Sequence, residues 1–69
     1  MILHIYDEHR WGEYTVVAFM RNDESVSTIR DWCCKTYGEP GFRWKDYISY
    51  GEVHLKNKED LTFFKLRWE

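Results

Sequence analysis

The stretch from Trp32 to Trp44 constrains the fold of this chain most, because it joins the end of a helix to a forced turn. Upstream of the turn, apolar residues recur at the i, i+3, i+4 spacing of a buried helical stripe, which Trp32 widens. The stripe consists of Val26, Ile29, Cys33 and Tyr37. This periodicity predicts a helix over about 24–37.

Both ends of that helix carry local signals. Asn22, Asp23 and Ser25 are N-cap candidates, since their short side chains can accept a hydrogen bond from a free backbone N–H. Gly38 occupies the position where a left-handed C′ residue is expected, and Pro40 prevents the helix from continuing. Pro40-Gly41 suits the centre of a type II turn, which requires a positive φ at its second residue.

Two strands are predicted before the helix. Ile2–Tyr6 is a β-rich run that ends at the charged group 7–10, and its apolar residues on both faces favour a central strand. Gly12 lies in a turn, and Tyr14–Met20 is β-branched and aromatic almost throughout. The simplest pairing is an antiparallel hairpin from residue 2 to residue 20.

The chain after the turn is less uniform. Residues 42–50 form either an extended edge or a short strand that pairs back through Gly51. In 52–56, Val53 and Leu55 alternate with Glu52, His54 and Lys56, the pattern of a strand with one wet face.

A last helix is predicted after Asn57, which has an acid three residues later, as in a capping box. Leu61, Phe64 and Trp68 mark its buried stripe, with Phe63 beside it, although the end of the chain is also compatible with a strand. The predicted fold class is therefore α+β: a small antiparallel or mixed sheet of three or four strands with two helices on one face. The expected order is strand-strand-helix-strand-helix.

The chain of 69 residues is short enough for one domain, 1–69, and it is unusually aromatic, with four Trp, five Tyr and four Phe. A core this small has little room for so many rings, and Trp and Tyr at a surface are favoured in interfaces. We therefore expect a homo-oligomer or a surface for a partner. The alternative explanation for the many aromatic residues is that a small protein inevitably leaves some of its rings half-exposed.

Charge and motifs exclude several classes. Ten Lys and Arg stand against twelve Asp and Glu, a net charge of −2, and both signs are interspersed along the chain. No apolar stretch is long enough to target or span a membrane, so we expect a soluble cytoplasmic protein. The adjacent Cys33 and Cys34 cannot form a disulfide framework, and their place near a helix C-terminus disfavours a reactive thiolate. The sequence predicts no metal site, no cofactor and no enzymatic activity.

The expected contact surface combines rings with a cation, which is typical of interface hot spots. Its residues are Phe42, Arg43, Trp44, Tyr47, Tyr50 and Trp11. The leading hypothesis is non-enzymatic binding of a protein partner through this surface. The alternative is a single-stranded nucleic-acid module that stacks bases on the aromatic and basic patch at 42–50, against the net negative charge of the chain.

The C-terminal part of the chain carries three short motifs: Trp32-Cys33, Gly38-Glu39-Pro40-Gly41-x-Arg43-Trp44 and Phe64-Lys65-Leu66-Arg67-Trp68. In these it resembles small uncharacterised proteins encoded by tailed bacteriophages. The resemblance implies a phage-made protein that acts in the host cytoplasm, in a class rich in small binders of host or phage proteins. It supplies no catalytic residues.

Overall fold

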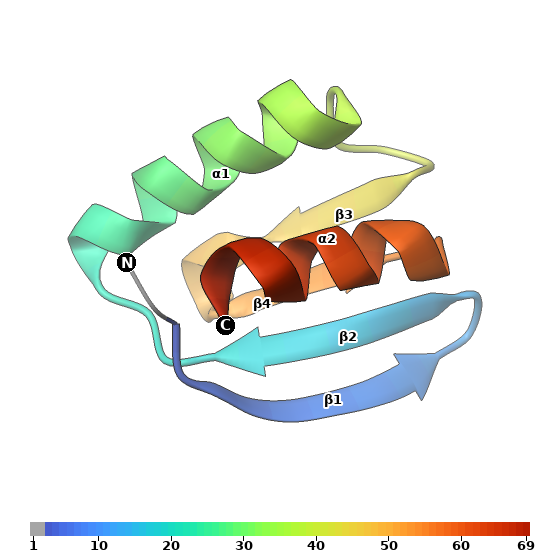
Figure 1. Cartoon of the computed structure of the whole chain (residues 1–69), viewed down its shortest axis with the longest axis horizontal. Helices are drawn as coiled ribbons and strands as arrows, with labels where there is room; N and C mark the ends of the chain where they lie inside the picture. Colours follow the sequence, from blue (N-terminus) through green and yellow to red (C-terminus); the bar gives the residue numbers. More distant parts are fainter. Residues whose placement is uncertain (1–2) are drawn as a thin grey trace.

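In the computed structural model, residues 3–69 are described, and they form a four-stranded antiparallel sheet with two helices on one face (Figure 1). The elements are β1 (Ile5–Trp11), β2 (Tyr14–Phe19), α1 (Asp23–Tyr37), β3 (Trp44–Tyr47), the 3-10 helix η1 (Ile48–Tyr50), β4 (Glu52–Leu55) and α2 (Lys58–Trp68). Their order across the sheet is β1-β2-β4-β3. The predicted α+β class is confirmed. The question left open for 42–50 is also answered, because this region contains β3 and η1.

Helix α1 begins and ends through the local signals in its sequence. The Asn22 side chain accepts a hydrogen bond from the Ser25 backbone N–H at 2.8 Å, and the Ser25 hydroxyl accepts one from the Asn22 N–H at 3.0 Å, a reciprocal capping box. At the other end, the Gly38 N–H donates to the Cys34 carbonyl at 2.9 Å. Gly38 has a positive φ of 90°, but its ψ of −169° places it outside the left-handed helical region that we expected.

Helix α2 buries Phe64 and Trp68 as predicted and remains helical through Trp68. The expected capping box at its start is wrong. The Asn57 side chain caps no backbone N–H; its amide instead lies 3.4 Å from the Asp60 carboxylate. The start of the helix is held by Asp60, whose role is described below.

The N-terminal hairpin forms, but the predicted bounds of its first strand are wrong. Ile2 lies outside the described residues, and β1 includes the charged group 7–10 that we expected to end the strand. β1 is an edge strand rather than a central one, so its charged side chains reach solvent. Its pairing with β2 shifts register between Ile5 and Asp7, a β-bulge that leaves Tyr6 exposed.

The predicted type II turn at Pro40-Gly41 is also wrong. Within residues 3–69, positive φ values occur only at Gly12, Gly38 and Gly51. The buried Trp44 organises the loop instead: its indole N–H donates to the Gly38 carbonyl at 2.9 Å, and its own carbonyl accepts the Gly41 N–H at 2.8 Å. The loop therefore takes its shape from the side chain that follows it.

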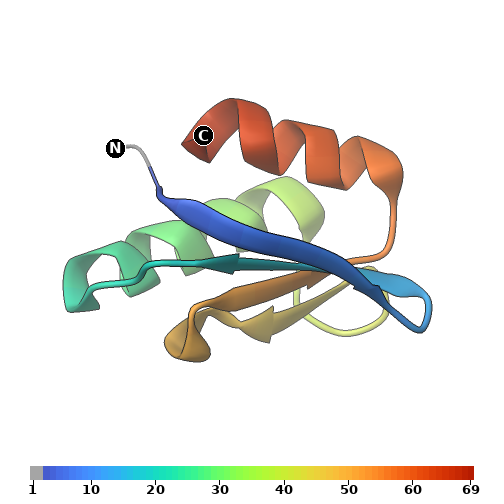
Figure 2. The same ribbon diagram turned by 90° about the horizontal axis from the view of Figure 1, so that it is seen from below.

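One face of the sheet holds the core. Val17, Phe19, Trp44, Val53 and Leu55 point from the strands toward α1 and α2, where Ile29, Cys33, Tyr37, Phe64 and Trp68 meet them. α2 lies above the sheet in Figure 2, while neither α1 nor α2 lies on its lower surface. We call this lower surface the open face.

Candidate binding surface on the open face

The open face is built by the alternation of side chains along the strands. Opposite residues of an antiparallel pair lie on the same face, and Val17 and Val53 face the core, so their neighbours face away from it. Carrying this register across the sheet gives the residues of the open face. They are Asp7, His9 and Trp11 on β1, Tyr14, Val16 and Ala18 on β2, Glu52 and His54 on β4, and Lys45 and Tyr47 on β3.

Two aromatic side chains converge over the centre of this face. The Trp11 ring meets the His54 ring edge-on, with centroids 5.8 Å apart, and the Tyr47 ring lies against it at 4.5 Å and 38°. Trp11 and Tyr47 come from the two edge strands, while His54 is on β4 between them. The rings keep large exposed fractions, 63% for Trp11 and 39% for Tyr47, so they remain available for contact.

A shallow pocket of about 340 Å³ opens beside these rings. Its lining consists of His9, Trp11, Val16, Tyr47, Glu52 and His54. Val16 and His54 are only 3% and 6% exposed although no helix covers them. The expectation that His54 lies on a wet face is therefore wrong, because side chains from the neighbouring strands cover it.

A carboxylate lies beside each of the two histidines of the pocket. The Glu52 carboxylate lies 3.2 Å from His54 Nε2, and the Asp7 carboxylate lies 2.8 Å from Nδ1 of His9. Because a carboxylate only accepts, Nε2 of His54 donates the hydrogen in this contact. Nδ1 of His54 is buried and has no hydrogen-bond partner among the described residues.

The cations of the open face lie outside the pocket. Lys45 Nζ sits 5.2 Å from the centroid of the Tyr14 ring, and Lys56 Nζ sits 4.3 Å from that of Phe42. Lys56 also lies 4.0 Å from the Glu13 carboxylate. Neither lysine lines the pocket, so its only fully charged lining group in residues 3–69 is Glu52.

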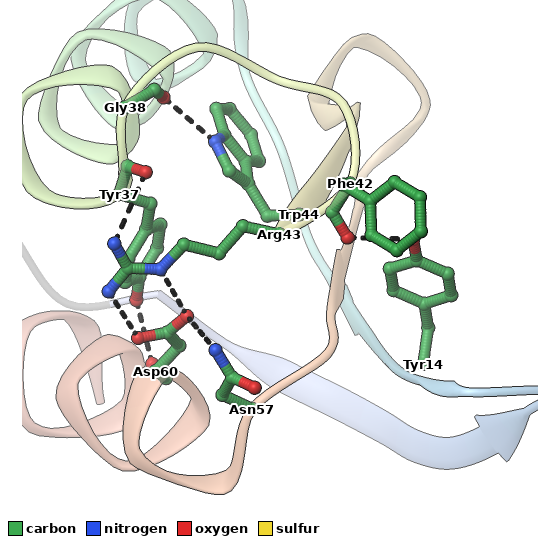
Figure 3. Close-up of polar contacts among 8 residues, drawn as sticks. All are labelled: Tyr14, Tyr37, Gly38, Phe42, Arg43, Trp44, Asn57 and Asp60. Carbon is green, nitrogen blue, oxygen red and sulfur yellow. Dashed lines mark hydrogen bonds and ion pairs between the residues drawn. The ribbon is translucent and has the colours of Figure 1, made fainter.

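The predicted contact residues separate into several places. Trp11 and Tyr47 meet at the pocket, whereas Phe42, 79% exposed, lies by Tyr14, whose hydroxyl donates to the Phe42 carbonyl at 2.8 Å (Figure 3). Tyr50, also 79% exposed, is on η1 and does not line the pocket. The prediction for Trp44 is wrong: it is 0% exposed, because it points from β3 toward the helices.

Arg43 serves mainly to join the two helices. Its Nε and Nη2 atoms each lie 2.9 Å from an oxygen of the buried Asp60 carboxylate, a bidentate pair (Figure 3). The Tyr37 hydroxyl donates to the Asp60 carbonyl at 2.7 Å. The hydrogen bond to Asp60 raises the pKa of Arg43, and burial raises the pKa of Tyr37. This network ties the start of α2 to the end of α1, and half of the Arg43 side chain stays exposed.

The buried Cys33 provides no reactive thiolate. Burial, followed by the charges of Cys34 and Asp46, raises the pKa of Cys33 to about 12, so its thiol stays protonated at neutral pH. Within residues 3–69, no three His, Cys, Asp or Glu side chains gather in a way that could hold a metal ion. In the same part of the chain, neither helix has the length and apolar character needed to cross a bilayer.

The sequence did not identify His9, Val16, Glu52 and His54 as part of a site. The alternation along 52–56 already placed Glu52 and His54 on one face, and the same alternation applied to 44–47 pairs Lys45 with Tyr47. What was missing was the strand order, which brings β1 and β3 to either side of the β2-β4 pair.

Comparison with known proteins adds no constraint, since no family model, no curated protein and no solved structure matches this chain. The similarity to proteins of tailed bacteriophages stays a prediction. The function must therefore be inferred from the open face itself.

Proposed function

We propose that this chain is a non-enzymatic binding module that docks a protein partner on the open face of its sheet. The observation that carries the proposal is the convergence of Trp11 and Tyr47, exposed rings from opposite edges of the sheet, over the buried His54. Rings fixed in this way offer a large contact area at little entropic cost, as hot spots of protein interfaces do.

The charges of the open face favour a protein over a nucleic acid. Its two lysines are accompanied by Asp7, Glu52 and the adjacent Glu13, so acids outnumber bases. Binding of single strands needs an excess of cations along the path of the phosphates, and its affinity falls steeply with salt. If the resemblance to phage proteins is correct, the partner is a host or phage protein.

The test is co-purification of the tagged protein from its natural cell, comparing the wild type with the Trp11→Ala/Tyr47→Ala double variant. Phe63→Ala/Leu66→Ala is the matched control, because it removes two exposed apolar side chains from α2, away from the pocket. We expect one partner to be recovered with wild type and control and lost with the double variant. Recovery that is unaffected by the double variant would contradict the proposal.

Two further measurements separate the other outcomes. Sedimentation that shows a dimer dissociated by the double variant identifies a second copy as the partner, whereas a strict monomer removes the homo-oligomer expectation. Fluorescence anisotropy with single-stranded oligonucleotides at low and physiological salt tests the alternative. Steeply salt-dependent binding that is lost in Lys45→Ala would replace the protein-binding proposal.

A further inference from the structure

We propose that the pocket between Trp11 and Tyr47 receives an arginine side chain of the protein partner. This inference rests on the proposed function and specifies the chemistry of the same site. It depends on three features of the pocket: the aromatic rings that line it, the sign of its charge and the hydrogen bond that positions the Glu52 carboxylate.

The rings make the pocket suitable for a planar cation. Trp and Tyr present an electron-rich π face, and a guanidinium stacks on such a face more favourably than a neutral group does. The chain already uses this contact elsewhere: the Arg43 guanidinium lies 5.5 Å from the centroid of the Tyr37 ring. The open sides of Trp11 and Tyr47 have no comparable cation within the described residues.

The charge of the pocket points to the same ligand. Glu52 is half-exposed and lines the pocket, and no lysine or arginine of residues 3–69 does so. The Asp7 carboxylate lies 2.8 Å from Nδ1 of His9, which also lines the pocket. An anionic side chain would meet the Glu52 carboxylate, which no lysine or arginine lining the pocket neutralises in residues 3–69, whereas a guanidinium can pair with this carboxylate and stack on the rings.

His54 positions the Glu52 carboxylate for such a ligand. The Glu52 carboxylate lies 3.2 Å from Nε2 of the buried imidazole, which donates the hydrogen of this contact. A guanidinium carries five N–H donors and no acceptor, so it can pair with this carboxylate while it stacks on the rings.

The experiment uses three capped peptides that differ in one side chain: acetyl-Gly-Arg-Gly-amide, its citrulline isostere, which keeps the shape but loses the charge, and its lysine counterpart. Binding is followed by NMR through the indole N–H of Trp11 and the amides of 45–54. We expect a saturable shift with the arginine peptide, at least tenfold weaker binding of the citrulline peptide, and intermediate binding of the lysine peptide.

Variants assign the effect to the pocket. Glu52→Gln keeps the size of the side chain and should weaken the arginine peptide about five- to tenfold, while Glu59→Gln on α2 should leave its affinity unchanged. Trp11→Ala should abolish the shift and Trp11→Phe should retain part of it. Dispersed amide spectra confirm that each variant is folded.

Equal binding of the arginine and citrulline peptides, or no saturable shift at Trp11, would overturn the inference. The inference would also be overturned if the oligonucleotide dT10 shifted the NMR signals of Trp11 and Tyr47 and the arginine peptide did not. Failure of this inference alone is recognised when partner capture still depends on Trp11 and Tyr47. If capture does not depend on them, the proposed function fails whatever the peptides do.

Discussion

The two faces of the sheet bury residues in different ways. The face toward α1 and α2 is covered by helices that contribute Ile29, Cys33, Phe64 and other apolar side chains. The open face has no helix, yet Val16 and His54 are almost as buried as the core. The rings of Trp11 and Tyr47 lie against His54, and Val16 is flanked by His9 and His54 on the neighbouring strands.

This difference shows that burial alone does not identify the core of a small sheet protein. A residue under a helix is held by many contacts that cannot be removed one at a time. A residue under two half-exposed rings is held by side chains that also meet solvent and can be displaced by a ligand. Buried residues on the open face therefore lie directly beneath exposed side chains, and mutations of these residues should affect binding more than stability.

The largest expected effect is the loss of stability on changing Trp44, the ring that both fills the core and shapes the loop 38–43. Trp44→Ala leaves a large cavity and frees the Gly38 carbonyl, and it should lower the free energy of unfolding by roughly 3–5 kcal/mol. Urea denaturation followed by circular dichroism measures this. Tyr50→Ala removes an exposed ring near in sequence and should change stability by less than about 0.5 kcal/mol. Similar losses in the two variants would contradict the assignment of faces.

The next effect is alkaline destabilisation through Cys33, on the covered face. Its pKa is raised from 9.0 to about 12 in the folded chain, so between these values the unfolded state releases a proton that the folded state keeps. Below pH 9 the buried thiol causes no loss of stability, and the free energy of unfolding falls as the pH rises from 9 toward 12. By pH 11 the loss caused by this one thiol amounts to roughly 2–3 kcal/mol.

Unfolding measured from pH 8 to pH 11 tests this prediction. Cys33→Ala should remove that part of the pH dependence, while Cys34→Ala should keep most of it, because burial is the largest cause of the raised pKa of Cys33. If the free energy of unfolding fell equally with rising pH in wild type and Cys33→Ala, burial under the helices would not be raising the pKa of this thiol.

A smaller effect is expected at the ion pair that joins the helices. Asp60→Asn keeps the size of the buried side chain but removes the charge that holds Arg43, and it should cost about 1–2 kcal/mol. Asp31→Asn breaks an exposed pair with Lys35 and should cost less than about 0.5 kcal/mol. Thermal unfolding of the two variants compares them directly. Equal losses would mean that the Arg43–Asp60 pair behaves as an ordinary surface contact.

The helices could be predicted from the sequence because their signals are local. Asn22 with Ser25 and the spacing of Ile29, Cys33 and Tyr37 lie within one segment, and they place α1 within one residue of its observed start. The strands depend on partners far along the chain. The charges at 7–10 indicate a strand end when only the local sequence is considered, but pairing with β2 carries β1 through them.

The site was harder to predict for the same reason. Without the pairing of β3 it was not known which side chains of 44–47 face the helices, and a shift of one residue exchanges the two faces. The sequence therefore places both Trp44 and Tyr47 at the contact surface, whereas in the structure Trp44 is in the core and Tyr47 is partly exposed. The pocket itself requires β1 and β3 to flank β2 and β4, and no short motif encodes that order.

Apart from the control variants, Trp11→Ala should have the smallest effect on stability, although it is the change with the largest expected effect on binding. Its ring is mostly exposed and contributes mainly an edge contact to His54, so Trp11→Ala should lower the free energy of unfolding by only about 0.5–1 kcal/mol. The loss of cover should appear locally, as a changed chemical shift of the His54 ring protons and faster amide exchange at Val16 and His54. Phe63→Ala on α2 is the control that should alter neither signal. If Trp11→Ala destabilised the chain as much as Trp44→Ala, the open face would be a second core rather than a binding surface.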